Sequence, residues 1–206
     1  MSFFAKTALV GLAMMFAAPA GMASAETIIT KSFAYFPVKG DTAADLDEAL
    51  LSAGPMVKGT GARHPGATEM KFGGSVTYAE HDNRCGIDSA RITLDTKIIL
   101  PRWTQRRRAD FDLALIWDTL AGDIKRHEER HAEIARQYAR QLERTIEELR
   151  PERDCALMEA EVARVTDEIL IEHDEDQARF DRVESINFEK RMVRLLEYRL
   201  QQLKSR

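Results

Sequence analysis

The first half of the chain alternates apolar and polar residues in the manner of β-strands with one buried face. Between residues 90 and 100 the even positions are mostly apolar and the odd positions mostly polar, and Pro101 ends this segment. Two earlier segments, 27–38 and 70–78, are rich in β-branched and aromatic residues. We therefore predict three strands in the N-terminal half.

The second half carries apolar residues at steps of three and four, which is the spacing of an amphipathic helix. One such stripe covers residues 110–149, and a second begins after Pro151 and leads into a basic helix at the C-terminus. Because only a few residues separate the two stripes, we expect the two helices to fold back on each other as an antiparallel hairpin. Residues 42–51 predict a further short helix between the first two strands.

Together these patterns predict an α+β fold, in which an N-terminal antiparallel sheet packs on a long antiparallel helical hairpin. The length that remains after residue 25 is usual for one domain. We expect a single domain over 26–206, strand-rich over 26–101 and helical over 102–206.

The first 25 residues have the three parts of a secretory signal peptide. Lys6 supplies a positive start, residues 7–19 are apolar but shorter than the ~20 residues of a membrane span, and residues 23–25 (Ala-Ser-Ala) form a small-residue cleavage site. We predict cleavage after Ala25, which would leave a periplasmic or secreted protein without a membrane span. The alternative is an uncleaved N-terminal anchor.

The formal net charge is small. It is -4 for the whole chain and becomes -5 when the signal segment, with its single Lys6, is removed. So mild a charge does not indicate a polyanion or an anionic membrane as a partner. We therefore expect no nucleic-acid partner.

The two cysteines, Cys85 and Cys155, both lie in the part predicted to be exported. An oxidising compartment allows such cysteines to pair and to stay paired. We predict a disulfide bond between them; the alternative is two separate buried thiols.

The sequence His127-Glu128-Glu129-Arg130-His131 interrupts the apolar stripe of the first long helix. Residues four apart lie on one helix face, so the two imidazoles can bind one Zn²⁺ ion at distances of ~2.0–2.1 Å. Glu128 can then reach a metal-bound water and act as the general base of a hydrolase. The alternative is a charged, solvated helix whose histidines are incidental.

A catalytic zinc usually has three protein ligands, and the motif supplies two. If the hairpin turn is centred near Glu152, the second long helix places Glu172, His173 and Asp176 opposite the two histidines. Each of these residues has an alternative interpretation as part of a solvated acidic face. Asp123, one turn before the motif, is a candidate to orient a ligand imidazole from behind, or else a carboxylate on the helix surface.

A set of short motifs runs through nearly all of the predicted mature chain. They are the run Tyr35 to Gly40, the pair Gly54-Pro55, Cys85 before the strand that ends in Leu100-Pro101-Arg102-Trp103, Trp117 upstream of the His-Glu-x-x-His sequence, and Cys155 after Pro151. In this order and spacing they resemble a bacterial domain of unknown function described as a predicted secreted zinc-dependent protease. The resemblance implies zinc ligands at His127 and His131 and a general base at Glu128. It also implies a disulfide between Cys85 and Cys155.

One region departs from that family's pattern. Many relatives follow a Tyr-Asp pair with Thr-x-His-Gly, whereas here Phe180-Asp181 leads to residues 185–188 (Ser-Ile-Asn-Phe). If the relatives' histidine is a third zinc ligand, its place is taken here by Asn187 or by a carboxylate such as Glu184 or Asp181.

These observations favour an exported, zincin-like peptidase that hydrolyses peptide bonds of a peptide or protein substrate through a metal-activated water. One alternative is a non-catalytic periplasmic scaffold or binding protein with a degenerate metal site. The other is a zinc amidase acting on cell-wall peptides, which shares the metal chemistry and differs in substrate.

Overall fold

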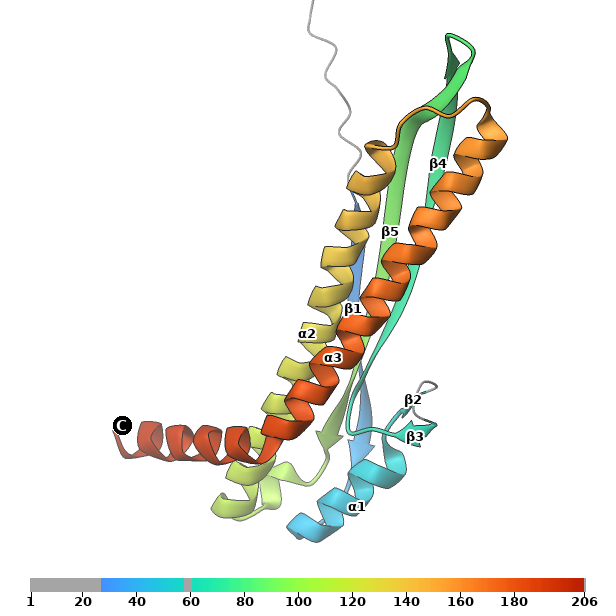
Figure 1. Ribbon diagram of the computed structural model, residues 1–206. Helices are drawn as coiled ribbons and strands as arrows, with labels where there is room; N and C mark the ends of the chain where they lie inside the picture. Colours follow the sequence, from blue (N-terminus) through green and yellow to red (C-terminus); the bar gives the residue numbers. More distant parts are fainter. Residues whose placement is uncertain (1–26, 58–60, 206) are drawn as a thin grey trace, which may run out of the picture.

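A three-stranded sheet forms one layer of the molecule, and two long helices cover one of its faces (Figure 1). The structure is a computed structural model that describes residues 27–57 and 61–205, so the predicted signal peptide over 1–25 lies outside the described residues. The strands of this sheet are β1 (Ile28–Val38), β4 (Ala67–His81) and β5 (Arg84–Trp103), in the spatial order β1-β5-β4. The three predicted strands are confirmed, although β4 and β5 extend further than the sequence pattern indicates.

β4 and β5 form a long hairpin, and its two-residue turn, Asp82-Asn83, has positive φ at both positions. Asp and Asn tolerate this left-handed conformation, which matches the twist of paired strands.

The prediction of an antiparallel sheet is wrong for β1, which runs parallel to β5. Val38 at the end of β1 pairs with Trp103, and Ala67 at the start of β4 pairs with Ile99, so the chain leaves β1 and enters β4 at the same end of β5. β1 and β4 therefore run in opposite directions on the two sides of β5. The sheet is mixed because β5 lies at its centre and pairs in parallel with β1 and in antiparallel with β4.

Three α-helices account for most of the remaining chain. They are α1 (Ala43–Ala53), α2 (Phe111–Glu147) and α3 (Cys155–Lys204), accompanied by the short strands β2 (Met56–Val57) and β3 (Ala62–Arg63) and the 3₁₀ helix η1 (Arg106–Arg108). The side chains of Thr42, Asp110 and Asp154 each accept a hydrogen bond from a backbone N–H in the first turn of the helix that follows. The predicted short helix is confirmed as α1. The predicted basic C-terminal helix is the last part of α3 and not a separate element.

The connection between α2 and α3 is fastened to the β4–β5 hairpin. Cys85 on β5 forms the predicted disulfide with Cys155, with an Sγ–Sγ distance of 2.04 Å. The backbones of Cys85 and Glu152 also exchange two hydrogen bonds, at 2.9 and 2.8 Å. One disulfide bond and one pair of backbone hydrogen bonds thus hold the α2–α3 connection against the sheet.

The core lies between the helices and the sheet. The even positions of β5 point into it, as the alternation predicts: Ile92, Leu94, Ile98 and Leu100 are all buried. α2 and α3 contribute apolar side chains that pack on this face, among them Leu142, Ile146, Met158, Val162, Val165 and Ile169. Burial of these side chains fixes α2 on the sheet and α3 beside α2 (Figure 1).

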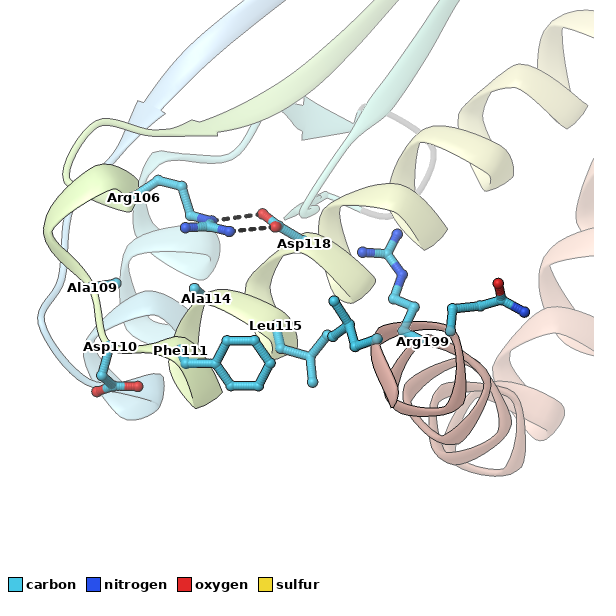
Figure 2. A pocket seen from close by; sticks show the side chains of 10 residues that line it. Arg106, Ala109, Asp110, Phe111, Ala114, Leu115, Asp118 and Arg199 are labelled. Atoms are coloured by element: carbon cyan, nitrogen blue, oxygen red, sulfur yellow. Dashed lines mark hydrogen bonds and ion pairs between the residues drawn. The ribbon is translucent and has the colours of Figure 1, made fainter. Parts of the chain in front are cut away.

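The C-terminal end of α3 lies beside η1 and the start of α2 (Figure 1). A cavity of about 540 Å³ there is lined by Phe111 and Leu115 of α2 and by Arg199 of α3, and Arg106 and Asp118 form an ion pair at its edge (Figure 2). The two histidines of the motif do not line this cavity. Among the described residues, we find no helix whose length and apolar content would let it span a membrane.

Candidate metal centre

Three potential ligand atoms converge between α2 and α3. His127 and His131 lie one helical turn apart on α2, and their Nε2 atoms are 3.0 Å apart. Asp181 of α3 places its Oδ1 3.2 Å from Nε2 of His127 and 3.0 Å from Nε2 of His131. These atoms therefore form a nearly equilateral triangle made by side chains of two different helices.

The triangle fits a tetrahedral zinc ion. Zn–N and Zn–O bonds of about 2.0–2.1 Å place the ligand atoms of a tetrahedral site roughly 3.3 Å apart, close to the three observed distances. The side chains of His131, His127 and Asp181 are 12%, 26% and 56% exposed, so the centre opens to solvent on the aspartate side. A fourth coordination position on that side can be reached by water.

The electrostatics of Asp181 and His131 favour positive charge between them. Burial opposes ionisation of Asp181, but hydrogen bonds with both imidazoles hold its pKa far below the usual value. Burial likewise opposes a charged His131, yet its hydrogen bonds to Asp181 and Gln177 raise its pKa above the ordinary value. A carboxylate that stays ionised next to an imidazole whose cationic form is stabilised also suits a bound divalent cation.

Glu128 lies next to this centre and is buried. Glu128 is 6% exposed, and this burial raises the pKa of its carboxyl group. His131, Thr68 and His127 each lower this pKa, but burial outweighs them. The hydroxyl of Thr68 on β4 is 2.9 Å from Oε2 of Glu128 and can donate to it. The carboxylate is thus held in a fixed place close to the two histidines.

Gly66, just before β4, makes room for this carboxylate. A Cβ atom at this position would lie 2.9 Å from Oε1 of Glu128 and 2.8 Å from Cγ2 of Ile124. Such contacts are too short for real Cβ atoms, so a larger residue here would displace the Glu128 carboxylate, Ile124 or the chain before β4.

Each histidine is also supported from its other side. Oε1 of Gln177 on α3 is hydrogen-bonded to Nδ1 of His131. The ring of Phe180 stacks on His127, with centroids 4.9 Å apart, and meets His131 edge-on at 5.1 Å. Nδ1 of His127 faces Glu184 at a longer distance of 3.7 Å. The imidazole planes are therefore fixed by α3 as well as by their own helix.

A network of four charged residues lies one turn below the histidines. Asp123 on α2 accepts hydrogen bonds from Arg126 at 3.0 Å and from Arg191 of α3 at 2.9 and 3.1 Å. Glu184 forms ion pairs with the same two arginines. Asp123 therefore binds guanidinium groups and does not orient an imidazole. The carboxylate that faces Nδ1 of His127 belongs to Glu184.

The other candidates for a third ligand lie elsewhere. His173 is buried between the rings of Phe72 and Tyr138, with centroids 5.1 and 5.5 Å from theirs. Asp176 forms an ion pair with Arg179 at 2.6 Å. Burial raises the pKa of Tyr138 to about 12, and a hydrogen bond between Tyr138 and Asp176 is the second cause.

The remaining candidates are also engaged with other groups. Glu172 accepts a hydrogen bond from Gln141 at 3.4 Å, and Glu184 belongs to the arginine network described above. Asn187 donates to the backbone of its own helix at Val183, 2.8 Å away. Of the carboxylates considered for the third ligand, Asp181 is the one that reaches both Nε2 atoms.

The assumed turn explains why the residues at 172–176 do not meet the histidines. The residue opposite His131 is Gln177, one helical turn beyond the expected His173. Because an apolar stripe repeats every turn, a shift by one turn still packs apolar residues against apolar residues. The pattern alone therefore could not distinguish the two registers.

Sequence reasoning also missed Thr68, Gln177 and Arg191. Gln177 did carry a signal, because it continues the buried stripe of α3 at a position where an amide must find partners. Thr68 carried none, since its role depends on how β4 crosses α2.

A protein-family model described as a bacterial protein of unknown function (DUF922) matches residues 33–189, a range that contains the three potential ligands and Glu128. Comparison with curated proteins and with solved structures gave no match. The family model covers well over half of the chain, and we conclude that the chain belongs to the DUF922 family of bacterial proteins.

Proposed function

We propose that this protein is an exported zinc-dependent peptidase in which His127, His131 and Asp181 bind the metal and Glu128 is the general base. The observation that carries the proposal is the triangle of two Nε2 atoms and one carboxylate oxygen, 3.0–3.2 Å on each side, next to a buried glutamate. The motif residues come from one helix and the third group from another, as in other sites that hold zinc with three protein ligands.

The chemistry follows from the positions of these groups. Zinc bound by three protein ligands lowers the pKa of a coordinated water toward ~7 and polarises a substrate carbonyl. Glu128, held by Thr68, is placed to accept the proton of the attacking water and to pass it to the leaving nitrogen. Burial raises the pKa of Glu128, which makes its carboxylate a stronger base than that of an exposed glutamate.

The exposure of Asp181 supports an enzyme over a purely structural metal site. Structural zinc sites usually have four protein ligands and are closed, whereas a catalytic site keeps one position open. Here the side chain of Asp181 is 56% exposed, so a substrate carbonyl would have access to a metal bound beside it. The disulfide between Cys85 and Cys155 further supports an oxidising compartment such as the periplasm or the extracellular medium.

The first experiment measures whether there is a metal site. We expect the purified protein to contain about one zinc per chain and the variants His131→Ala and Asp181→Ala to lose it. Lys125→Ala, which removes an exposed partner of Glu129 on the same helix, is the matched control and should keep the metal. A wild-type protein that binds no zinc would overturn the proposal.

The second experiment separates catalysis from binding. Turnover of casein or of peptidoglycan peptides should be abolished in Glu128→Gln while the zinc content stays the same. Glu129→Gln changes the neighbouring residue, whose carboxylate points to Lys125 at 3.3 Å, and should remain active. Zinc retained without turnover of either substrate would favour the non-catalytic scaffold, and turnover of cell-wall peptides alone would favour the amidase.

A further inference from the structure

We propose that Gln177 is a positioning residue, which holds His131 with its proton on Nδ1 and its Nε2 lone pair free to face the metal. The inference deepens the proposed function and rests on it for the metal. The backbone carbonyl oxygen of His131 can only accept a hydrogen bond, which fixes the orientation of the Gln177 amide next to it.

That carbonyl settles which way the amide of Gln177 points. An amide side chain has an oxygen that accepts and a nitrogen that donates, and the two are otherwise hard to distinguish. A backbone carbonyl oxygen can only accept, so the Gln177 atom 3.1 Å from the carbonyl oxygen of His131 must be the nitrogen. The amide oxygen is then the atom that faces Nδ1 of His131.

The orientation of the amide in turn places the proton of the imidazole. Oε1 of Gln177 has no hydrogen to give, so Nδ1 of His131 must donate to it. The neutral ring then carries no proton on Nε2, the atom directed at His127 and Asp181, so its lone pair can face a cation; in the protonated ring Nε2 donates to Asp181 instead. Gln177 thus selects the form of His131 that can bind a cation.

The second N–H of the amide extends the chain of hydrogen bonds to His173. Its Nε2 lies 2.9 Å from the amide nitrogen of Gln177 and must accept, so the proton of a neutral His173 is on Nδ1. Nδ1 in turn faces Oδ1 of Asp174 at 2.9 Å. Asp174 is 82% exposed, so the chain leads from the metal centre to solvent through groups that each have one defined role.

Burial explains why this arrangement matters. Gln177 is 9% exposed and His173 is 4% exposed, and a buried amide that lacks partners costs on the order of 1–3 kcal/mol. Both N–H groups and the oxygen of the Gln177 amide have partners, and two of these three hydrogen bonds are made with His131. Gln177 binds both the ring and the backbone carbonyl of His131. A side chain that only filled space between the helices would bind neither.

The test compares Gln177→Met with Gln141→Met in the full-length protein. Gln141 on α2 donates to Glu172 of α3 at 3.4 Å, so it controls for loss of an amide that links the two helices. Zinc affinity, measured by competition with a chelator, should fall roughly 10- to 100-fold in Gln177→Met, as is usual when an outer partner of a ligating histidine is removed. Gln141→Met should bind zinc as the wild type does.

A second measurement does not depend on the metal. In ¹⁵N NMR spectra of the metal-free wild type, Nδ1 of His131 should carry a proton across neutral pH, and in Gln177→Met this preference should be lost. Unchanged zinc affinity in folded Gln177→Met, or an unprotonated Nδ1 in the wild type, would overturn the inference. If the wild type binds no zinc, the proposed function fails, and the NMR measurement still decides the role of Gln177.

Discussion

Thr68 and Glu128, which are 60 residues apart in the sequence, are joined by a side-chain hydrogen bond. The hydroxyl of Thr68 lies 2.9 Å from Oε2 of Glu128 and also 2.9 Å from its backbone oxygen. The single hydroxyl proton of Thr68 is shared between these two acceptors, so the start of β4 holds the carboxylate next to the helix backbone that carries it. Strand β4, and not only the motif on α2, determines where the proposed general base lies.

Replacement of Thr68 by Val should separate activity from metal binding. The variant keeps the shape of the side chain but leaves Oε2 of a buried carboxylate without its donor. A hydrogen bond to a charged group contributes about 1.5–3 kcal/mol, so turnover should fall about 10-fold or more while one zinc per chain is retained. Thr77→Val, on the exposed part of the same strand, is the matched control. Equal turnover in Thr68→Val and the wild type would show that the hydroxyl does not position Glu128.

Gly66→Ala should also reduce activity, for a steric reason. The added Cβ would lie 2.9 Å from Oε1 of Glu128, so either the carboxylate or the chain before β4 has to move. We expect lower turnover together with a lower melting temperature. Gly86→Ala places its Cβ at an ordinary 3.4 Å from Pro151 and should be tolerated. If both alanine variants behave alike, the close approach at Gly66 is not needed.

Much of the local structure could be predicted from the sequence because it depends on neighbouring residues. The alternation along β5, the helix that begins after Thr42 and the spacing of His127 and His131 each follow from a period of two or 3.6 residues. The pairing of Cys85 with Cys155 was the one long-range contact within reach, because the chain has two cysteines.

Relations between elements could not be predicted in the same way. The parallel pairing of β1 depends on which strand occupies the centre of the sheet, and no local pattern records this. The identity of the proposed third ligand on α3 depends on the register of two helices whose apolar stripes fit equally well after a shift of one turn. Asp181 therefore could not be chosen over His173 until the contacts of Gln177 showed the register.

The two registers make opposite predictions for zinc. Asp181→Ala removes an oxygen of the triangle and should lower the affinity by more than about 100-fold, beyond the effect typical of an outer hydrogen bond. His173→Phe removes only a partner of Gln177 and should still bind one zinc per chain, within about tenfold of the wild-type affinity. Isothermal titration of both variants checks this. Loss of zinc in His173→Phe with retention in Asp181→Ala would reverse the assignment.

The disulfide should contribute substantially to stability. Cys85 and Cys155 are 70 residues apart, and the chain-entropy model gives about 4 kcal/mol for a loop of this length. In urea, the variant in which both cysteines are replaced by Ala should show a free energy of unfolding lower by this order. Reduction of the wild type should have a similar effect. A change below about 1 kcal/mol would mean that the hydrogen bonds between Cys85 and Glu152 suffice to hold the connection.

The pair of Asp123 and Arg191 predicts how stability depends on pH. Burial alone would raise the pKa of Asp123, but hydrogen bonds from Arg191 and Arg126 outweigh it, and the pKa lies below its ordinary value of 3.8. When the pKa is lower in the folded state, the unfolded chain takes up the proton first as the pH falls. The stability that Asp123 provides is therefore complete above pH 3.8 and is lost as the pH falls through the folded-state pKa.

Asp123→Asn tests this directly. At pH 6 the variant should be less stable than the wild type by on the order of 2 kcal/mol, because a buried carboxylate with charged hydrogen bonds to Arg191 has been lost. As the pH falls below 3.8 the unfolded chain takes up a proton at Asp123 while the folded protein does not, so the difference should shrink, and it should approach zero as the pH passes the folded-state pKa. Urea unfolding at pH 6 and at pH 3 measures both values, and Asp118→Asn, which removes a more exposed ion pair of α2, should cost little at pH 6. A difference that stays constant between the two pH values would mean that Asp123 does not stabilise the fold through its charge.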